Sequence, residues 1–236
     1  MDASAASTPH HGTGFEQVNA TRVIATTVGL IFAISGMNHG LFEALQGSKP
    51  TGGLFIQAIG DAQRFWPLGT EDAFTIVPNF LATGVLAMLV GLAIIIWSIR
   101  FLPSRRGRVV FLGLFVLLFL VGGGIGQLAF FIPAWAFATR IGKPLTWWGK
   151  VLPPGVRPFL SRSWAVTLAL SSIAILIGLE IAVFGYVPGM TDPERIQAVA
   201  LLFVLASAIL NIITFIAGLG HDLLRMQARL ARGTAV

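Results

Sequence analysis

Long apolar runs dominate the chain, and short polar segments separate them. Four runs are long enough for a helix of about 20 residues, the length that crosses a bilayer with a hydrocarbon core of about 30 Å. They cover residues 22–46, 73–99, 165–187 and 198–220. The pattern predicts an all-α fold, a polytopic integral membrane bundle of four to six transmembrane helices. This bundle fills residues 22–220, between a disordered cytoplasmic tail (1–21) and a basic amphipathic tail (221–236).

A fifth apolar stretch, residues 109–139, fits no simple span. It is interrupted by four glycines between residues 122 and 126, and it contains Pro133. Glycine permits a helix to unwind, so the stretch can form one long kinked helix or two half-length arms that enter and return. Arms of this length cannot cross a bilayer alone and must be buried among other helices.

The distribution of Lys and Arg favours the two-armed form, because these residues concentrate in cytoplasmic loops. If 109–139 does not cross, thirteen of the sixteen basic residues share one side; if it crosses once, the best division is ten against six. The thirteen are Arg22, Arg100, Arg105, Arg106, Arg108, Arg140, Lys143, Lys150, Arg157, Arg162, Arg225, Arg229 and Arg232. We expect both termini to be cytoplasmic, in a plasma or inner membrane, while the single crossing stays open.

Composition supports the membrane assignment. Hydrophobic residues make up 55% of the chain and charged residues 11%, and the mean hydropathy is +0.81. Soluble domains carry about 25% charge, and disordered chains are far less apolar. The net charge of +6 would suggest nucleic acid in a soluble protein. Here the basic residues lie in loops beside apolar runs, so we expect no nucleic-acid partner.

The expected partner is the bilayer itself. Arg225, Arg229 and Arg232 follow one another at helical spacing beside Leu and Met residues, as on a short amphipathic helix. They are expected to contact the anionic cytoplasmic leaflet. A small polar solute or cation, and a second copy of the chain, are the other candidate partners.

The sequence lacks the residues and motifs that several common kinds of catalytic or binding site require. The chain has no Cys and none of the common nucleotide-binding, metalloprotease or serine-hydrolase motifs. A haem held by two histidines would have to use His39 and His221, which face opposite sides if 109–139 is a hairpin. We therefore predict no cofactor and no metal, and the sequence identifies no catalytic residue.

The richest polar cluster ends the first run, where Asn38, His39 and Glu43 share one helical face. Polar side chains in a bilayer are costly, and His39 and Glu43 are spaced to share a hydrogen bond or ion pair. Gly36 and Gly40 would let another helix approach this face. The cluster is a candidate site for a proton, a cation or a small polar solute, with a hydrated helix end as the alternative.

Glu180 lies in an otherwise apolar segment, where a carboxylate is either protonated or paired inside the bundle. Its candidate partners are His39, Asn38, Asn79 and Tyr186. We include Glu180 and Asn79 among the candidate binding residues, against the alternative of a structural hydrogen bond between helices.

Asn211 completes the candidate set. It lies near the middle of the last run, on a polar stripe with Ser207 and Thr214. Such a stripe more often joins helices than lines a path. The loop 47–72 carries several charged residues, and within it residues 53–66 resemble a short amphipathic helix over an acidic vestibule.

These features lead to one main hypothesis and two alternatives. The main one is a small transport or permeation protein, or a membrane sensor, that binds a proton, cation or small polar solute. An intramembrane enzyme acting on a lipid, with His39 and Glu43 as acid and base, is the first alternative. A non-catalytic membrane assembly subunit is the second.

Overall fold

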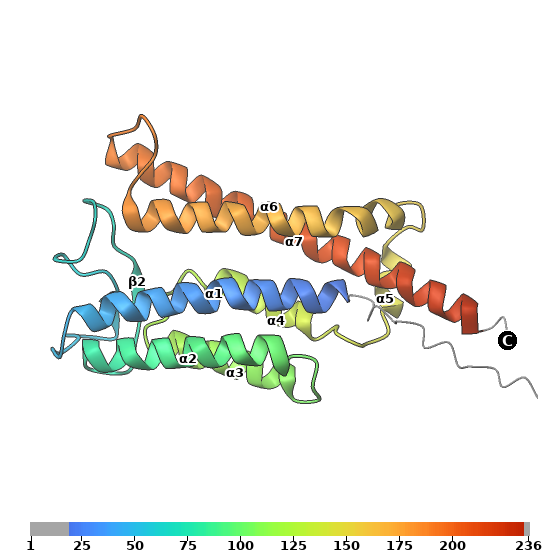
Figure 1. The fold of residues 1–236 in the computed structure, drawn as a ribbon, viewed down its shortest axis with the longest axis horizontal. Helices are drawn as coiled ribbons and strands as arrows, with labels where there is room; N and C mark the ends of the chain where they lie inside the picture. Colours follow the sequence, from blue (N-terminus) through green and yellow to red (C-terminus); the bar gives the residue numbers. More distant parts are fainter. Residues whose placement is uncertain (1–18, 234–236) are drawn as a thin grey trace, which may run out of the picture.

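In a computed structural model, which describes residues 19–233, the chain folds almost entirely into helices (Figure 1). Helices account for 68% of the chain, and four of the seven described helices are long and apolar enough to cross a membrane. The long helices are α1 (Ala20–Leu45), α2 (Phe80–Arg100), α6 (Arg157–Phe184) and α7 (Pro193–Gly233). The others are α3 (Gly107–Leu120), α4 (Leu128–Ala138) and α5 (Thr146–Val151), with strands β1 (Phe55–Gln57) and β2 (Asp72–Phe74).

The stretch predicted at 109–139 forms two short helices that enter and leave at the same end of the bundle. Nη1 of Arg108, in the first turn of α3, donates to the carbonyl oxygen of Thr139, just after α4, at 3.1 Å. The glycine-rich segment 121–127 makes the turn between them (Figure 1). This is the hairpin that the charge distribution favours, and it places the basic loops 101–106 and 139–145 close together.

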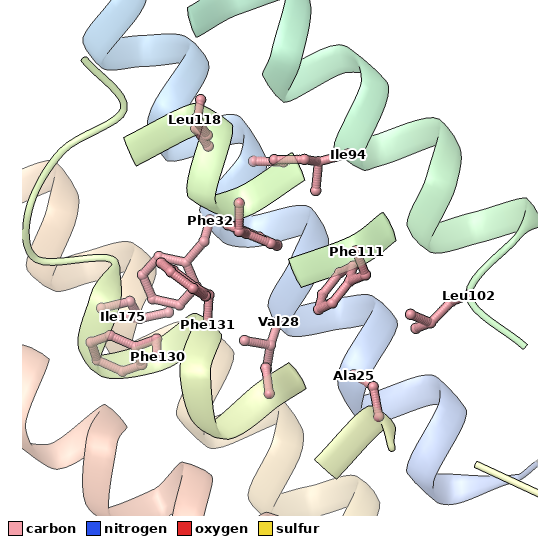
Figure 2. Packing of buried hydrophobic residues seen from close by; sticks show 14 of the residues in the cluster. Ala25, Val28, Phe32, Ile94, Leu102, Phe111, Leu118, Phe130, Phe131 and Ile175 are labelled. Carbon is pink, nitrogen blue, oxygen red and sulfur yellow. The ribbon is translucent and has the colours of Figure 1, made fainter. Parts of the chain in front are cut away.

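The hairpin is held by an aromatic core on the inner faces of α1 and α2. Phe111 and Phe115 of α3 are buried, and Phe115 stacks on Phe131 of α4 with ring centroids 5.0 Å apart. Phe32 of α1 stacks on Phe130 in the same way, at 4.6 Å (Figure 2). Burial of these rings gives the two arms, which are too short to cross a bilayer, a large contact area with their neighbours.

Glycines bring α1 and α2 into close contact. A Cβ on Gly40 would lie 2.6 Å from the carbonyl oxygen of Gly84, so only glycine fits at this crossing. Gly36, the other member of the predicted pair, packs on Leu118 of α3 instead. The small-residue face of α1 therefore takes two different neighbours.

Helices α6 and α7 form a pair with much closer contact to each other than to α1. Their buried serines bond reciprocally: Ser171 Oγ donates to the Ser207 carbonyl at 3.1 Å, and Ser207 Oγ to the Ser171 carbonyl at 3.0 Å. Asp222 of α7 accepts from the backbone N–H groups of Ala20 and Thr21, both at 3.0 Å. The last helix thus caps the first.

Several predicted boundaries differ from the structure. Residues 73–79 precede α2 in strand and loop, and Asn79 caps the helix by accepting from Ala82 N–H. Helix α1 begins at Ala20, and α7 runs without a break through the predicted boundary at residue 220. Residues 1–18 and 234–236 of the predicted tails lie outside the described residues, as does the side chain of Arg232.

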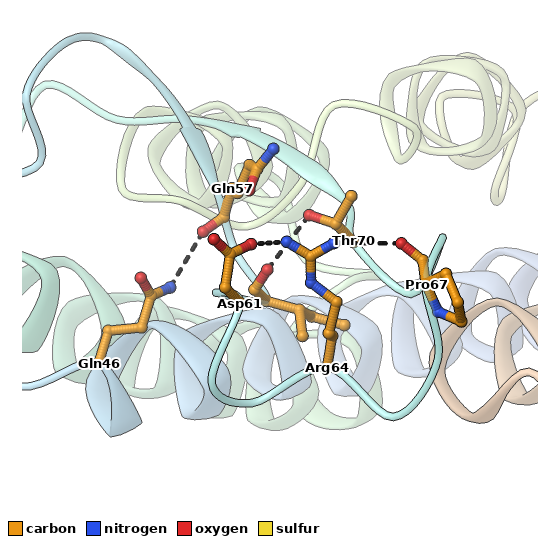
Figure 3. A network of polar contacts seen from close by, with 7 residues as sticks. Gln46, Gln57, Asp61, Arg64, Pro67 and Thr70 are labelled. Carbon is orange, nitrogen blue, oxygen red and sulfur yellow. Dashed lines mark hydrogen bonds and ion pairs between the residues drawn. The ribbon is translucent and has the colours of Figure 1, made fainter.

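The loop between α1 and α2 contains no helix at 53–66; that prediction was wrong. Residues 55–57 form β1, which pairs antiparallel with β2. Figure 3 shows the polar contacts that fix the loop: Arg64 forms an ion pair with Asp61 and donates to the Pro67 carbonyl at 3.1 Å. The backbone N–H and C=O groups of β1 form hydrogen bonds with β2. A short isolated helix is only marginally stable, so the strand pairing is favoured here. The loop also reaches α6, since Trp66 Nε1 donates to the Ala182 carbonyl at 3.0 Å.

Candidate functional site

His39 lies on the buried face of α1, three-quarters of the way along the helix. Its side chain is 10% exposed, and its Nε2 forms an ion pair with Glu71 Oε2. Its Nδ1 is buried and has no hydrogen-bond partner among the described residues. Nε2 is therefore engaged with Glu71, and the hydrogen-bonding capacity of Nδ1 is unused among the described residues.

Glu71 reaches His39 from the loop just before β2, where the β1–β2 pairing fixes the backbone. Burial alone would raise the pKa of Glu71, but the positive charge of His39 and its hydrogen bond hold that pKa below its usual value of 4.5. The sequence predicted that the charged loop 47–72, which contains Glu71, lies at an acidic vestibule, and it did not identify Glu71 as the partner of His39. Loop residues far along the chain carry no spacing signal for such a contact.

Glu43 lies one helical turn beyond His39 and is fully buried. The two side chains form no bond with each other, and neither carboxylate oxygen of Glu43 has a hydrogen-bond partner among the described residues. The Thr83 hydroxyl interacts with this carboxyl. However, it also donates to the Val121 carbonyl at 2.8 Å and bonds with the Thr75 hydroxyl at 2.6 Å.

The glycine turn closes over both side chains. Gly122 lies against the Glu43 carboxylate, and Gly124 lies against the His39 imidazole. Both glycines have positive φ angles, +97° and +94°, which other residues rarely adopt. The turn is tied to the neighbouring loop, because Gly122 N–H donates to the Phe74 carbonyl at 3.0 Å. The glycines that interrupt the apolar stretch 109–139 in the sequence therefore form one wall of this site.

Two cavities meet at the ion pair. The first, of about 460 Å³, lies between α1 and α6, and the second, of about 330 Å³, lies beside the glycine turn. Ser35, His39, Glu71 and Leu179 line both cavities. The His39–Glu71 pair is thus part of the partition between two hollow regions of the bundle.

Glu180 and Asn38 line the first cavity, but both side chains are exposed on the flank of the bundle. Glu180 makes no hydrogen bond or ion pair with any described residue, so none of the predicted partners reaches it. Its position is the mouth of the cavity, whereas His39 is at its inner end. Hydropathy locates Glu180 in a span but does not say which face of α6 carries it.

Asn79 and Asn211 lie apart from this cluster. Asn79 caps α2, and its Nδ2 donates to the Ser48 hydroxyl at 3.1 Å. Asn211 is buried on α7, where its Nδ2 donates to the Ser207 carbonyl at 3.2 Å. These contacts give each asparagine a structural role, and neither residue lines the two cavities at His39.

In the part of the chain that the structure describes, no group of three His, Asp or Glu side chains is close enough to hold a metal ion. Comparison with protein-family models, with curated proteins and with solved structures found no match to this chain. Function must therefore be argued from the site itself.

Proposed function

We propose that this chain is a polytopic membrane protein of the transport, permeation or sensor class, with a proton as the bound species at His39, Glu43 and Glu71. Both termini would be cytoplasmic, in a plasma or inner membrane, because the basic loops gather at the end of the bundle where α1 begins. The observation that carries the proposal is the Glu43 carboxylate, fully buried and without a hydrogen-bond partner among the described residues.

An ionised carboxylate in such surroundings is costly, because no opposite charge among the described residues faces it and the nearby Thr83 hydroxyl is also bonded to the Val121 carbonyl and to Thr75. Binding a proton removes that cost directly. His39 offers a second proton position at Nδ1, one turn away on the same helix. His39 and Glu43 thus form a short series of proton sites. The series runs from the His39–Glu71 pair, which lines both cavities, to the glycine turn that lies against Glu43.

The ion pair supplies the element that responds to protonation. Protonating Glu71 removes its charge and weakens its attraction to His39. Because the pair lines both cavities, its separation would join them. Glu71 lies on the loop that also bonds to α6 through Trp66, so a change at the pair reaches a second helix. That coupling suits a transporter or a sensor.

Proton flux into proteoliposomes tests the proposal. Liposomes containing the purified protein and an internal pH dye are given a potassium diffusion potential with valinomycin. Wild-type protein should acidify the lumen, and Glu43→Gln should reduce the signal to that of protein-free liposomes. Glu194→Gln is the matched control, because Glu194 is exposed at the start of α7. No flux with wild-type protein, or equal flux with Glu43→Gln, would contradict the transport form of the proposal.

One observation favours a second candidate, an intramembrane enzyme acting on a lipid. The first cavity is lined mainly by apolar side chains, such as Ile34, Leu41 and Leu176, and the His39–Glu71 pair is part of its lining. An amphiphile could place its polar end there for acid–base chemistry. Turnover of a labelled lipid that is lost in His39→Ala and retained in Glu194→Gln would favour this candidate.

A further inference from the structure

A separate cavity lies at the opposite end of the bundle, where α1 begins. It measures about 320 Å³ and is bounded by the loop after α4, by the last part of α7 and by Asn19. The α7 residues that line it are Asp222, Arg225, Met226 and Arg229, which recur at the spacing of one helical face. Packing of α7 against α1 therefore builds this wall.

The cavity is strongly basic. Arg140 and Lys143 line it from the loop, and Arg225 and Arg229 line it from α7. Among the described lining residues Asp222 is the single carboxylate, and its oxygens already accept the N–H groups of Ala20 and Thr21. Arg140, Lys143 and Arg229 thus bring positive charge to one space, and the carboxylate among its described lining residues is engaged with α1, an arrangement that favours an anion.

The position of the cavity identifies the kind of anion. The apolar run of α7 ends at residue 220, and the cavity begins at Asp222, so it lies within one turn of the hydrocarbon boundary. Trp147 and Val151 of the adjacent helix α5 are both about half-exposed or more, as expected of side chains at a membrane interface. This is the depth of lipid headgroups.

We propose that this cavity binds the phosphate of an anionic phospholipid headgroup. Arginine presents its N–H groups in a fork that matches phosphate oxygens, and basic cavities between helices on the cytoplasmic side are suited to such headgroups. Leu145 and Met226, which also line the cavity, give the apolar part of the lipid a surface to contact. This is one defined site, more specific than a general attraction of the basic tail to the leaflet.

Thermal unfolding of the purified full-length protein in neutral detergent tests the proposal, with tryptophan fluorescence as the readout. Three additions are compared: dioleoylphosphatidylglycerol, dioleoylphosphatidylcholine and sodium phosphate. The anionic lipid should raise the midpoint temperature of the wild type by at least about 3 °C, and the zwitterionic lipid should not. The shift should disappear in Arg140→Gln/Lys143→Gln.

The matched control is Arg105→Gln/Arg106→Gln, which removes the same charge from an exposed loop at the same end and should keep the shift. If the first double variant does not fold, Arg225→Gln/Arg229→Gln removes the charge from the other wall and should lose the shift. Equal loss in the control would show general charge attraction and overturn the site. Equal stabilisation by sodium phosphate would show that the site binds free phosphate and not a lipid headgroup. No shift in the wild type would overturn both the site and the lipid as its ligand.

Discussion

Gly124 packs against the imidazole of His39 so closely that a Cβ at residue 124 would lie 2.7 Å from the ring Cε1. No real Cβ contact is that short, so the ring or the turn would have to move. The φ angle of +94° at Gly124 adds strain for any other residue. The glycine turn and the histidine must therefore be accommodated together.

Replacing this glycine should damage both stability and the site. Gly124→Ala is expected to destabilise the protein by about 1–3 kcal/mol, through the backbone conformation and the contact with His39. Thermal unfolding in detergent measures the effect, which should be a fall of roughly 3–10 °C in midpoint temperature. Gly126→Ala is the control, because nothing lies within 4 Å of the position of its added Cβ and its φ is not positive. Equal midpoints for the two variants would refute the proposed packing.

The ion pair predicts a specific loss of stability in acid. The pKa of Glu71 in the folded protein lies below its usual value of 4.5, so the ionised form is stabilised by folding. This contribution is complete above the usual pKa and is lost as pH falls through the lowered value. Unfolding midpoints of the wild type and Glu71→Gln should therefore differ by about 2–4 °C at neutral pH.

The difference between wild type and Glu71→Gln should shrink as pH falls below 4.5 and through the lowered pKa of Glu71, where the wild-type carboxyl becomes neutral. Comparing the two proteins at each pH removes the contribution of other carboxyl groups. Asp192→Asn is a suitable control, since Asp192 is exposed and pairs with Arg195 at the surface. If the difference in unfolding midpoint between the two proteins were unchanged at low pH, the charge of Glu71 would not be the source of the stabilisation.

The hairpin predicts which loops are accessible from the same side of the membrane. The chain has no Cys, so single cysteines can be labelled without background. Ser104→Cys and Thr146→Cys should resist an impermeant maleimide in intact cells and react after lysis, whereas Thr191→Cys should react in intact cells. All three positions are exposed in the structure. Opposite accessibility of positions 104 and 146 would require a single crossing between them.

Hydropathy was sufficient to predict the four long helices, because each must present an apolar surface along its length. It could not decide the fate of residues 109–139, since one long helix and two short ones have the same mean hydropathy. The positions of Arg100, Arg105 and Arg140 indicated the hairpin, and the bond from Arg108 to Thr139 places its ends together. Charge thus carried information about topology that apolarity did not.

The candidate site was only partly predictable. Periodicity placed His39 and Glu43 on one face, and the structure buries both. Their predicted bond to each other is absent, because His39 pairs with Glu71 from a distant loop. Glu180 was expected inside the bundle and lies exposed at a cavity mouth. Contacts between separate elements depend on tertiary packing, and a single sequence gives no measure of them.

The bonds from Ala20 and Thr21 to Asp222 have a consequence for biosynthesis. Helix α1 leaves the ribosome first, yet acceptors for its leading amides arrive only with the final helix. Until α7 has been translated as far as residue 222, these amides depend on water or headgroups at the membrane surface. Maturation of the opening turn is therefore a late event, and a nascent chain halted before residue 222 would lack it.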